Sequence, residues 1–151
     1  MQRRTVYNHF PNDGALFAAC SAHWRSQHPA PDPERWTDLR QGLGELYAWY
    51  RETEPMTANV LRDAELLPSL REVIEPGLGA YSLAVRRALG RAYGRSRRVD
   101  AAIRVAVDFH VWRSLGALGD EEAVELAAGL VELAAARTSR SRGSRARPAR
   151  S

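Results

Sequence analysis

The sequence predicts an all-α protein. Apolar residues recur every three or four positions through most of the chain, and no segment shows the two-residue alternation of a half-buried strand. Prolines, glycines and short polar stretches separate the helical segments. With 151 residues, the chain suits one domain with appendages and can bury a core without metal or disulfide bonds.

Two helices are expected at the beginning of the chain. Residues 3–10 form a short one, which should end at Pro11 because the residue before a proline disfavours the helical conformation. Asn12 is a suitable N-cap for a second helix that runs to about Gln27. The proline-rich residues 29–33 then form a stiff link.

A longer helix is predicted over residues 34–53. Apolar residues at spacings of three and four mark its buried face: Trp36, Leu39, Leu43, Leu46, Tyr47 and Tyr50. Pro55 should interrupt this helix, and a short helix follows until Pro68 ends the region. The next helix is expected over residues 69–93, with a kink or a break at Pro76.

The last part of the chain combines arginine-rich and apolar segments. Residues 86–98 read RRALGRAYGRSRR, and arginines near a helix C-terminus are favoured by the helix dipole, so this cluster need not bind anything. Apolar helices are expected over residues 99–118 and 120–137, the second with acidic residues in its first turn. Residues 138–151 hold five of the 22 arginines and no acid, which favours a disordered tail over one that contacts phosphates.

Composition limits where the protein works. The single cysteine, Cys20, cannot form an internal disulfide, which favours a reducing compartment. No apolar run approaches the roughly 18–20 residues that span a bilayer, and the N-terminus lacks a signal pattern. We therefore expect a soluble cytoplasmic protein with no membrane partner.

The first predicted helix has the character of a DNA-reading helix. Val6 and Phe10, four residues apart, form its apolar side. Arginine, asparagine, threonine and tyrosine side chains contact phosphates and base edges in the major groove. The candidate DNA-binding residues are Arg3, Arg4, Thr5, Tyr7, Asn8 and His9. The alternative is a short amphipathic helix with an arginine-rich start.

The stretch TVYNHFPNDGALFAA resembles the tetracycline-repressor (TetR) family of bacterial transcription regulators. The residues that match the family's recognition helix and the start of the next helix, in order, are Thr5, Val6, Tyr7, His9, Phe10, Ala15 and Leu16. The resemblance implies backbone contacts by Thr5, Tyr7 and His9, with Arg4 and Asn8 nearer the bases. Two positions depart from the family pattern: Asp13 replaces a phosphate-contacting lysine, and Gly14 replaces the usual acid.

The resemblance also implies a domain organisation. Residues 1–23 would be the end of a helix-turn-helix DNA-binding domain, residues 24–137 a helical ligand-binding and dimerisation domain, and residues 138–151 the tail. The family builds its DNA-binding domain from three helices, and this chain begins at the third. Either the start is misassigned or the protein is a truncated regulator, so DNA binding by this chain alone is doubtful.

An effector pocket and a dimer are further expectations from the resemblance. The last two helices would form the dimer face through Val111, Leu115, Leu126, Leu130 and Leu133, although the same residues could form an intramolecular core. Ligand sites are apolar with few convergent polar groups, as in the segment DFHVWRSL. The candidate pocket residues are Trp49, Tyr50, Met56, Tyr81, Phe109, His110, Trp112 and Arg113.

An enzyme is the less favoured class. Cys20 and His23, with His28 beyond, could form a nucleophile or part of a zinc site, but a fourth ligand is missing. Cys20 is better explained by packing within an alanine-rich helix. We therefore expect no catalytic residues, metal or cofactor. The predicted function is a TetR-like repressor released from operator DNA by a small-molecule effector, and the alternative is a helical dimer or sensor that does not bind DNA.

Overall fold

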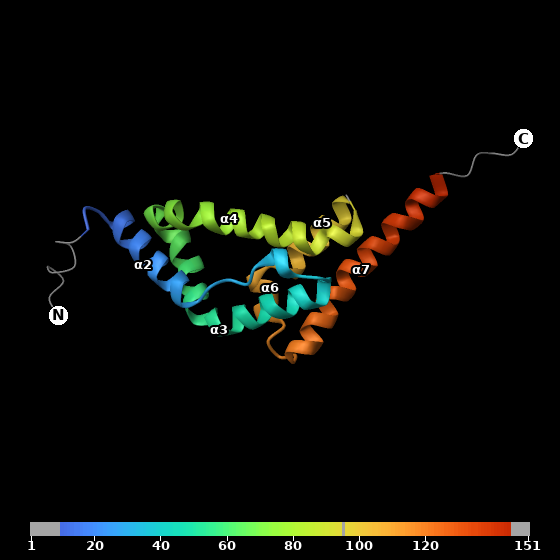
Figure 1. Ribbon diagram of the computed structural model, residues 1–151, viewed down its shortest axis with the longest axis horizontal. Coiled ribbons are helices and arrows are strands. Elements are labelled where there is room, and N and C mark those ends of the chain that lie inside the picture. Colours follow the sequence, from blue (N-terminus) through green and yellow to red (C-terminus); the bar gives the residue numbers. More distant parts are fainter. Residues whose placement is uncertain (1–9, 95, 146–151) are drawn as a thin grey trace, which may run out of the picture. The chain divides into compact units, whose positions relative to one another are not determined.

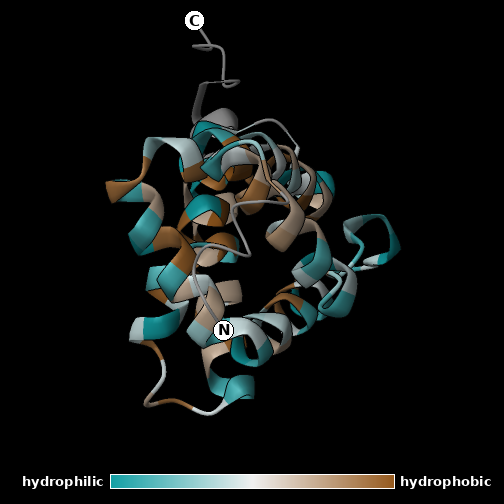
Figure 2. Ribbon diagram, turned by 90° about the vertical axis from the view of Figure 1, so that its left-hand side faces the viewer, coloured by the Kyte–Doolittle hydropathy of each residue, from teal (hydrophilic) through white to brown (hydrophobic). Residues whose placement is uncertain are grey.

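The computed structural model describes residues 10–94 and 96–145, and this part of the chain is helical without any strand (Figure 1). The all-α prediction is therefore confirmed. Figure 2 shows hydrophilic and hydrophobic stretches alternating along the helices, as expected when each helix buries one face. The elements are α2 (Asp13–Gln27), η1 (Pro33–Arg35), α3 (Leu39–Leu66), α4 (Pro68–Gly90), η2 (Arg91–Tyr93), α5 (Arg97–Ala106), α6 (Phe109–Ser114) and α7 (Asp120–Arg145).

The chain divides into two compact units, and α3 and α4 each contribute to both. Unit 1 comprises Met1–Ala30 and Tyr50–Leu83, and unit 2 comprises Pro31–Trp49 and Ala84–Ser151. Contacts thus group the whole of α2 with unit 1, whereas the resemblance placed a boundary at residue 23 within this helix. None of the helices in the described part of the chain is long and apolar enough to cross a membrane.

Unit 1 is built from α2, the second part of α3 and the first part of α4. The Asn12 side chain accepts a 2.9 Å hydrogen bond from the backbone N–H of Ala15, so the predicted cap of α2 is confirmed. Phe17 of α2 packs against a small cluster formed by Ala64, Leu70 and Ile74. Helix α2 buries no residue fully, so partly buried side chains such as Phe17 anchor it.

Only Leu67 separates α3 from α4, and a polar contact joins the end of one helix to the start of the other. The guanidinium group of Arg71 donates to the carbonyls of Ala64 and Glu65, both at 3.1 Å. Carbonyls in the last turn of a helix have no intrahelical partner, and Arg71 supplies one. Pro68 begins α4, where its missing N–H costs nothing.

The predicted interruption at Pro55 is wrong, because α3 continues through this residue. Helix α4 likewise continues through Pro76 without a break. A proline within a helix costs about 3 kcal/mol. That cost is offset because both helices are held by buried residues on either side, including Leu46 and Ala64 in α3.

The prediction of one helix over residues 99–118 is also wrong, because the chain forms α5 and α6 instead. Asp108 lies between them with an extended backbone, at ψ 128. Its side chain accepts 2.9 Å hydrogen bonds from the N–H groups of His110 and Val111. Asp108 is therefore the N-cap of a new helix, a role that favours a break at this position.

The core of unit 2 is formed by η1, the first part of α3, the end of α4, and α5 to α7. The predicted buried face of residues 34–53 is largely confirmed, since only Tyr50 is half-buried and the rest are buried. Trp36, however, precedes α3 and is the C-cap of η1. Helix α5 packs along α7. Helix α7 begins with Asp120, Glu121 and Glu122, as predicted, and its backbone is helical to Arg145, which includes the first residues of the predicted tail. No proline lies between Asp120 and Arg145 to stop it.

Gly42 lets α3 approach two buried side chains closely. A Cβ atom at this position would lie 2.5 Å from Leu89 Cδ2 and 2.8 Å from Trp36 Cε3. Both neighbours are buried. Trp36 is also fixed by a 2.8 Å hydrogen bond from its Nε1–H to Glu45, so its ring cannot move aside freely.

We predict that Gly42→Ala destabilises the protein. Overpacking of this kind costs about 1–3 kcal/mol, which exceeds or cancels the roughly 1 kcal/mol that alanine gains over glycine in a helix. The control is Gly44→Ala on the same helix, where an added Cβ meets nothing within 4 Å and should stabilise the fold. Urea unfolding measures both variants, and equal stabilisation by the two would contradict the close approach at Gly42.

Candidate functional site

The predicted DNA-reading residues, Arg3, Arg4, Thr5, Tyr7, Asn8 and His9, lie outside the described residues. The described chain begins at Phe10, which is half-buried, and α2 starts directly after the Asn12 cap. Asp13, which occupies the position of the family's phosphate-contacting lysine, is exposed in the first turn of α2. A carboxylate placed there repels phosphate.

The thiol and imidazole groups of α2 do not form an enclosed site. Cys20 and His23 are both exposed, so the prediction that Cys20 packs in the protein is wrong. The physical reason is that α2 rests on unit 1 through Phe17 and buries no residue fully. In the described part of the chain, no three histidine, cysteine or acidic side chains are placed to hold a metal ion.

Three aromatic rings form the centre of unit 2. The ring centroids of Phe109 and Trp112 lie 5.5 Å apart, and those of Tyr47 and Trp112 lie 6.4 Å apart. All three side chains are buried, at spacings typical of favourable aromatic pairs. Phe109 and Trp112 were predicted to line a ligand pocket, and within unit 2 they are core residues.

The polar candidates on α6 point the other way. His110 and Arg113 are exposed, so they do not line an enclosed pocket in unit 2. The cap at Asp108 sets this arrangement. It starts a helix in which Phe109 and Trp112, three residues apart, face inwards, and the residue after each faces solvent.

The other pocket candidates are distributed over both units. Trp49 belongs to unit 2, whereas Tyr50, Met56 and Tyr81 belong to unit 1. Met56 is 45% exposed and the three aromatic residues are half-buried. Their joint participation in a pocket stays a prediction. Unit 2 has an open depression of about 330 Å³, lined by none of the predicted pocket residues but by Gly44, Asp120, Glu121, Val124 and Glu125.

Helix α7 exposes its largest apolar side chains and buries its small ones. Leu126, Leu130 and Leu133 are 56%, 42% and 54% exposed, and their spacing places them on one face, which we call the leucine face. The buried residues of α7 are Ala123, Val124, Ala127, Ala128 and Val131. Val111 and Leu115, the other predicted dimer residues, are half-buried. The three leucines therefore do not form an intramolecular core among the described residues.

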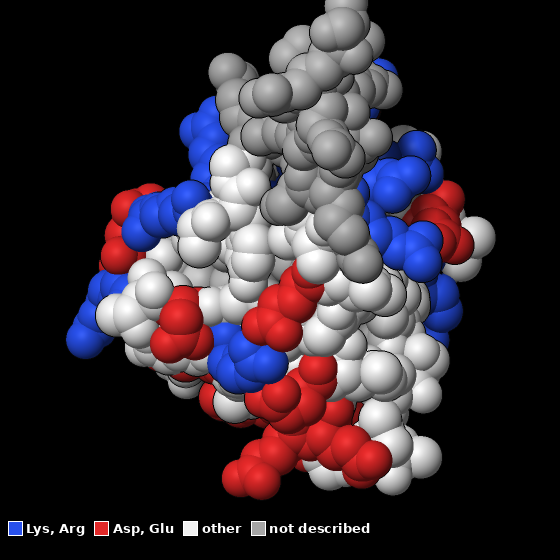
Figure 3. All heavy atoms as spheres, turned by 90° about the vertical axis from the view of Figure 1, so that its right-hand side faces the viewer, with Lys and Arg blue, Asp and Glu red and all other residues white. Residues whose placement is uncertain are grey.

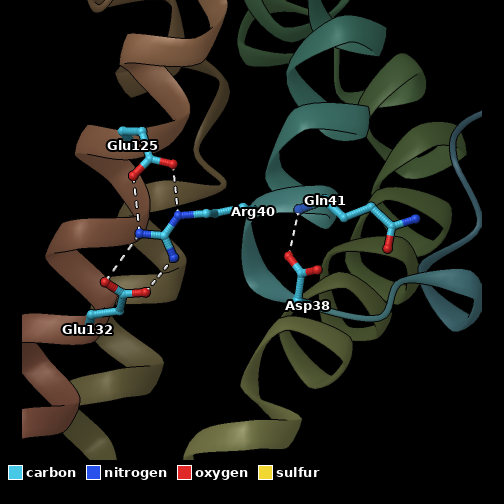
Figure 4. A network of polar contacts seen from close by, with 5 residues as sticks. All are labelled: Asp38, Arg40, Gln41, Glu125 and Glu132. Atoms are coloured by element: carbon cyan, nitrogen blue, oxygen red, sulfur yellow. Dashed lines mark hydrogen bonds and ion pairs between the residues drawn. The ribbon is translucent and has the colours of Figure 1, made fainter.

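An arginine that the sequence analysis did not single out holds α7 in place (Figure 4). Arg40 Nε donates to Glu125 Oε1 at 2.7 Å, and Arg40 Nη1 donates to Glu132 Oε1 at 2.5 Å. This guanidinium group lowers the pKa of Glu132, and the two carboxylates raise the pKa of Arg40. The seven-residue spacing of the glutamates was visible in the sequence, but their common partner lies far away in the chain.

The first turn of α3, which carries Arg40, is itself fixed. The Asp38 carboxylate accepts a 2.9 Å hydrogen bond from the backbone N–H of Gln41 (Figure 4). This bond lowers the pKa of Asp38, because it stabilises the ionised form. The contacts of Arg40 with Glu125 and Glu132, which we call the Arg40 clamp, therefore join the capped start of α3 to α7. The two glutamates are adjacent in sequence to Leu126 and Leu133.

Tyr47 connects α3 to the break between α5 and α6. Its side chain is 0% exposed, and its hydroxyl donates a 2.7 Å hydrogen bond to the carbonyl of Ala106, the last residue of α5. A carbonyl in the last turn of a helix lacks an intrahelical donor, so this bond satisfies it. Burial raises the pKa of Tyr47 to about 12.

We predict that Tyr47→Phe lowers stability by about 1–3 kcal/mol at neutral pH, because the buried Ala106 carbonyl loses its partner. A raised pKa means that the folded state holds the phenolic proton more tightly than the unfolded state. The stability gained from this is complete below about pH 10 and is lost as the pH rises towards 12. Between these pH values, urea unfolding should show that the variant loses less of its free energy of unfolding than the wild type. A smaller decline with pH should remain, because burial also raises the pKa of Tyr93. An unchanged alkaline decline would contradict this account.

Comparison with known proteins gave no match. No family model matches the chain, and neither a curated protein nor a solved structure is significantly similar to it. The functional interpretation therefore depends on the sequence motif and on the geometry described above.

Proposed function

We propose that the protein is a TetR-like transcription regulator, a repressor whose operator binding is relieved by a small-molecule effector. The observation that carries this proposal is the ordered sequence TVYNHF, followed through Pro11 by a capped helix. Asn12 fixes the start of α2 immediately after the motif, so residues 3–10 would precede α2 as a separate short helix. That order suits a reading helix followed by a connecting helix.

A second copy of the chain is the partner that the leucine face supports. Leaving a leucine side chain in water forfeits about 1.5–3 kcal/mol relative to burial. Three such side chains on one face of α7 would gain substantially from pairing with the same face of another copy. A twofold dimer of this kind would carry two reading helices and match a palindromic operator.

The effector would act by shifting a conformational equilibrium. A ligand changes operator affinity only to the extent that it binds one conformation of the dimer better than the other. In the proposed mechanism, the effector favours the conformation in which the two reading helices no longer match the spacing of the operator half-sites.

The second candidate is a helical dimer or sensor that does not bind DNA. It is favoured by Asp13, because this exposed carboxylate stands where the family places a phosphate-binding lysine. Both candidates share the leucine face and differ in the role of residues 3–10. DNA selection experiments therefore discriminate between them.

The repressor proposal predicts that the full chain enriches a palindromic sequence from a random duplex library, whereas the second candidate predicts no enrichment. Asn8→Ala should then weaken binding to that sequence by about 1–3 kcal/mol and relax the preference for one base in each half-site. The control is Arg25→Gln on the exposed surface of α2. If no sequence is enriched although the protein is a dimer, the repressor proposal is wrong and the second candidate stands.

We predict that Leu130→Glu converts a dimer to a monomer, because each copy would bury a carboxylate at the apolar contact. Sedimentation equilibrium measures the change. The matched control is Leu66→Glu, since Leu66 is 74% exposed on α3 and lies outside the leucine face. A wild-type monomer, or a variant that dimerises as well as the wild type, would show that α7 is not the dimer contact.

A further inference from the structure

Within residues 10–137, positive charge is concentrated in one segment. Residues 86–104 contain seven arginines and one acidic residue, Asp100. The rest of residues 10–137 contains eight arginines and 17 acidic residues. The end of α4, η2 and the first part of α5 form this segment, which we call the arginine hairpin. In Figure 3 the acidic side chains gather at the lower end of the view, where Figure 1 places the start of α7.

Three of the hairpin arginines have structural partners. Asp100 accepts contacts from Arg86 Nη1 at 3.6 Å and from Arg104 Nε at 3.0 Å. Arg91 Nη2 lies 2.5 Å from a carboxylate oxygen of Glu34. The contact between Arg86 and Asp100 also brings the last turns of α4 beside the first turn of α5. These arginines therefore hold the hairpin together and need no external ligand.

The other described arginines of the hairpin have no such role. Arg87, Arg97 and Arg98 are exposed, and none of them pairs with a carboxylate among the described residues. The helix dipole explains Arg87, which lies in the last turn of α4. It does not explain Arg97 and Arg98, which occupy the first turn of α5, where the dipole disfavours cations.

We propose that the arginine hairpin binds the phosphate backbone of duplex DNA without sequence preference, through Arg87, Arg97 and Arg98. Backbone binding requires exposed cations and no apolar pocket. An interface with an acidic protein usually has an apolar centre with large anchoring side chains. Among the described residues of the hairpin, no large apolar side chain is substantially exposed, and Val105, which is 45% exposed, lies just beyond it.

The surrounding negative charge restricts this contact to the hairpin, because the rest of residues 10–137 repels a polyanion. The inference does not depend on residues 3–9 or on the proposed repressor function. If the protein also reads an operator, the hairpin would add affinity without adding sequence preference. Such binding is strongly salt-dependent, since each phosphate contact releases a condensed counterion.

The test compares the full-length wild type with the triple variant Arg87→Gln, Arg97→Gln and Arg98→Gln. Fluorescence anisotropy measures binding to a random-sequence duplex between about 50 and 200 mM salt. The slope of log K against log salt should be smaller in magnitude by about 0.9 for each lost contact, or about 2.7 in total. The matched control carries Arg25→Gln, Arg35→Gln and Arg62→Gln, which remove the same charge from exposed positions outside the hairpin. Circular dichroism checks that both variants remain folded.

Three results would overturn the proposal. The triple variant could keep the wild-type affinity and slope, or the control could reduce both equally, which would indicate net charge alone. The third result is a triple variant that keeps DNA binding but no longer associates with other copies at low salt. That result would mean that the hairpin contacts an acidic protein surface, such as the first turn of α7. Selection from the random duplex library separates this test from the repressor proposal, because an enriched palindrome requires base contacts, which the hairpin does not supply.

Discussion

The hydrogen bond from Tyr47 to the carbonyl of Ala106 links the parts of unit 2 on which its shape depends. Two groups that would be costly to bury alone satisfy each other, and leaving either unpaired costs about 1–3 kcal/mol. The bond holds the end of α5 against α3, and Asp108 then starts α6 as a separate helix. Because α6 starts there, Phe109 and Trp112 enter the core beside Tyr47, and His110 remains at the surface.

Helix α7 reverses the usual arrangement of large and small apolar residues. Alanines and valines face α5 and the core, so the helices can approach closely, while the leucines face outwards. Arg40 ties this helix to α3 through Glu125 and Glu132 and so fixes the direction of the leucine face. An exposed pair of ions contributes little stability by itself, but a bidentate arginine contact constrains geometry. The clamp is therefore better understood as orienting α7 than as stabilising it.

Charge is separated within the chain as clearly as apolar surface is. Within residues 10–137, the arginine hairpin is a segment in which arginines outnumber acidic residues, and the first turn of α7 is acidic. Some arginines in the hairpin serve the fold through Asp100 and Glu34, and the others leave a positive surface exposed. The overall net charge of +4 conceals this separation, since the excess positive charge lies in short segments and the remainder is negative.

The sequence by itself determined the features that arise within a few residues. These include the all-α class, the Asn12 cap and the extent of α2, the acidic first turn of α7, and most of the buried face of α3. Such features depend on capping groups and helical periodicity, which act over one or two turns. The motif at residues 5–10 also belongs to the sequence alone, because residues 1–9 lie outside the described part.

Only the tertiary structure decided the features that depend on distant partners. Pro55 and Pro76 lie within helices because packing on both sides offsets their local cost, and the break before α6 occurs where Asp108 can cap a new helix. The leucines of α7 are exposed because alanines occupy the face towards α5. Periodicity alone could not show which of the two faces is buried. Arg40 meets carboxylates 85 and 92 residues away, and no local signal specifies such a pairing. Helix propensities of about 1 kcal/mol per residue or less favour helix formation locally, whereas the burial of whole apolar side chains determines which helix faces pack together.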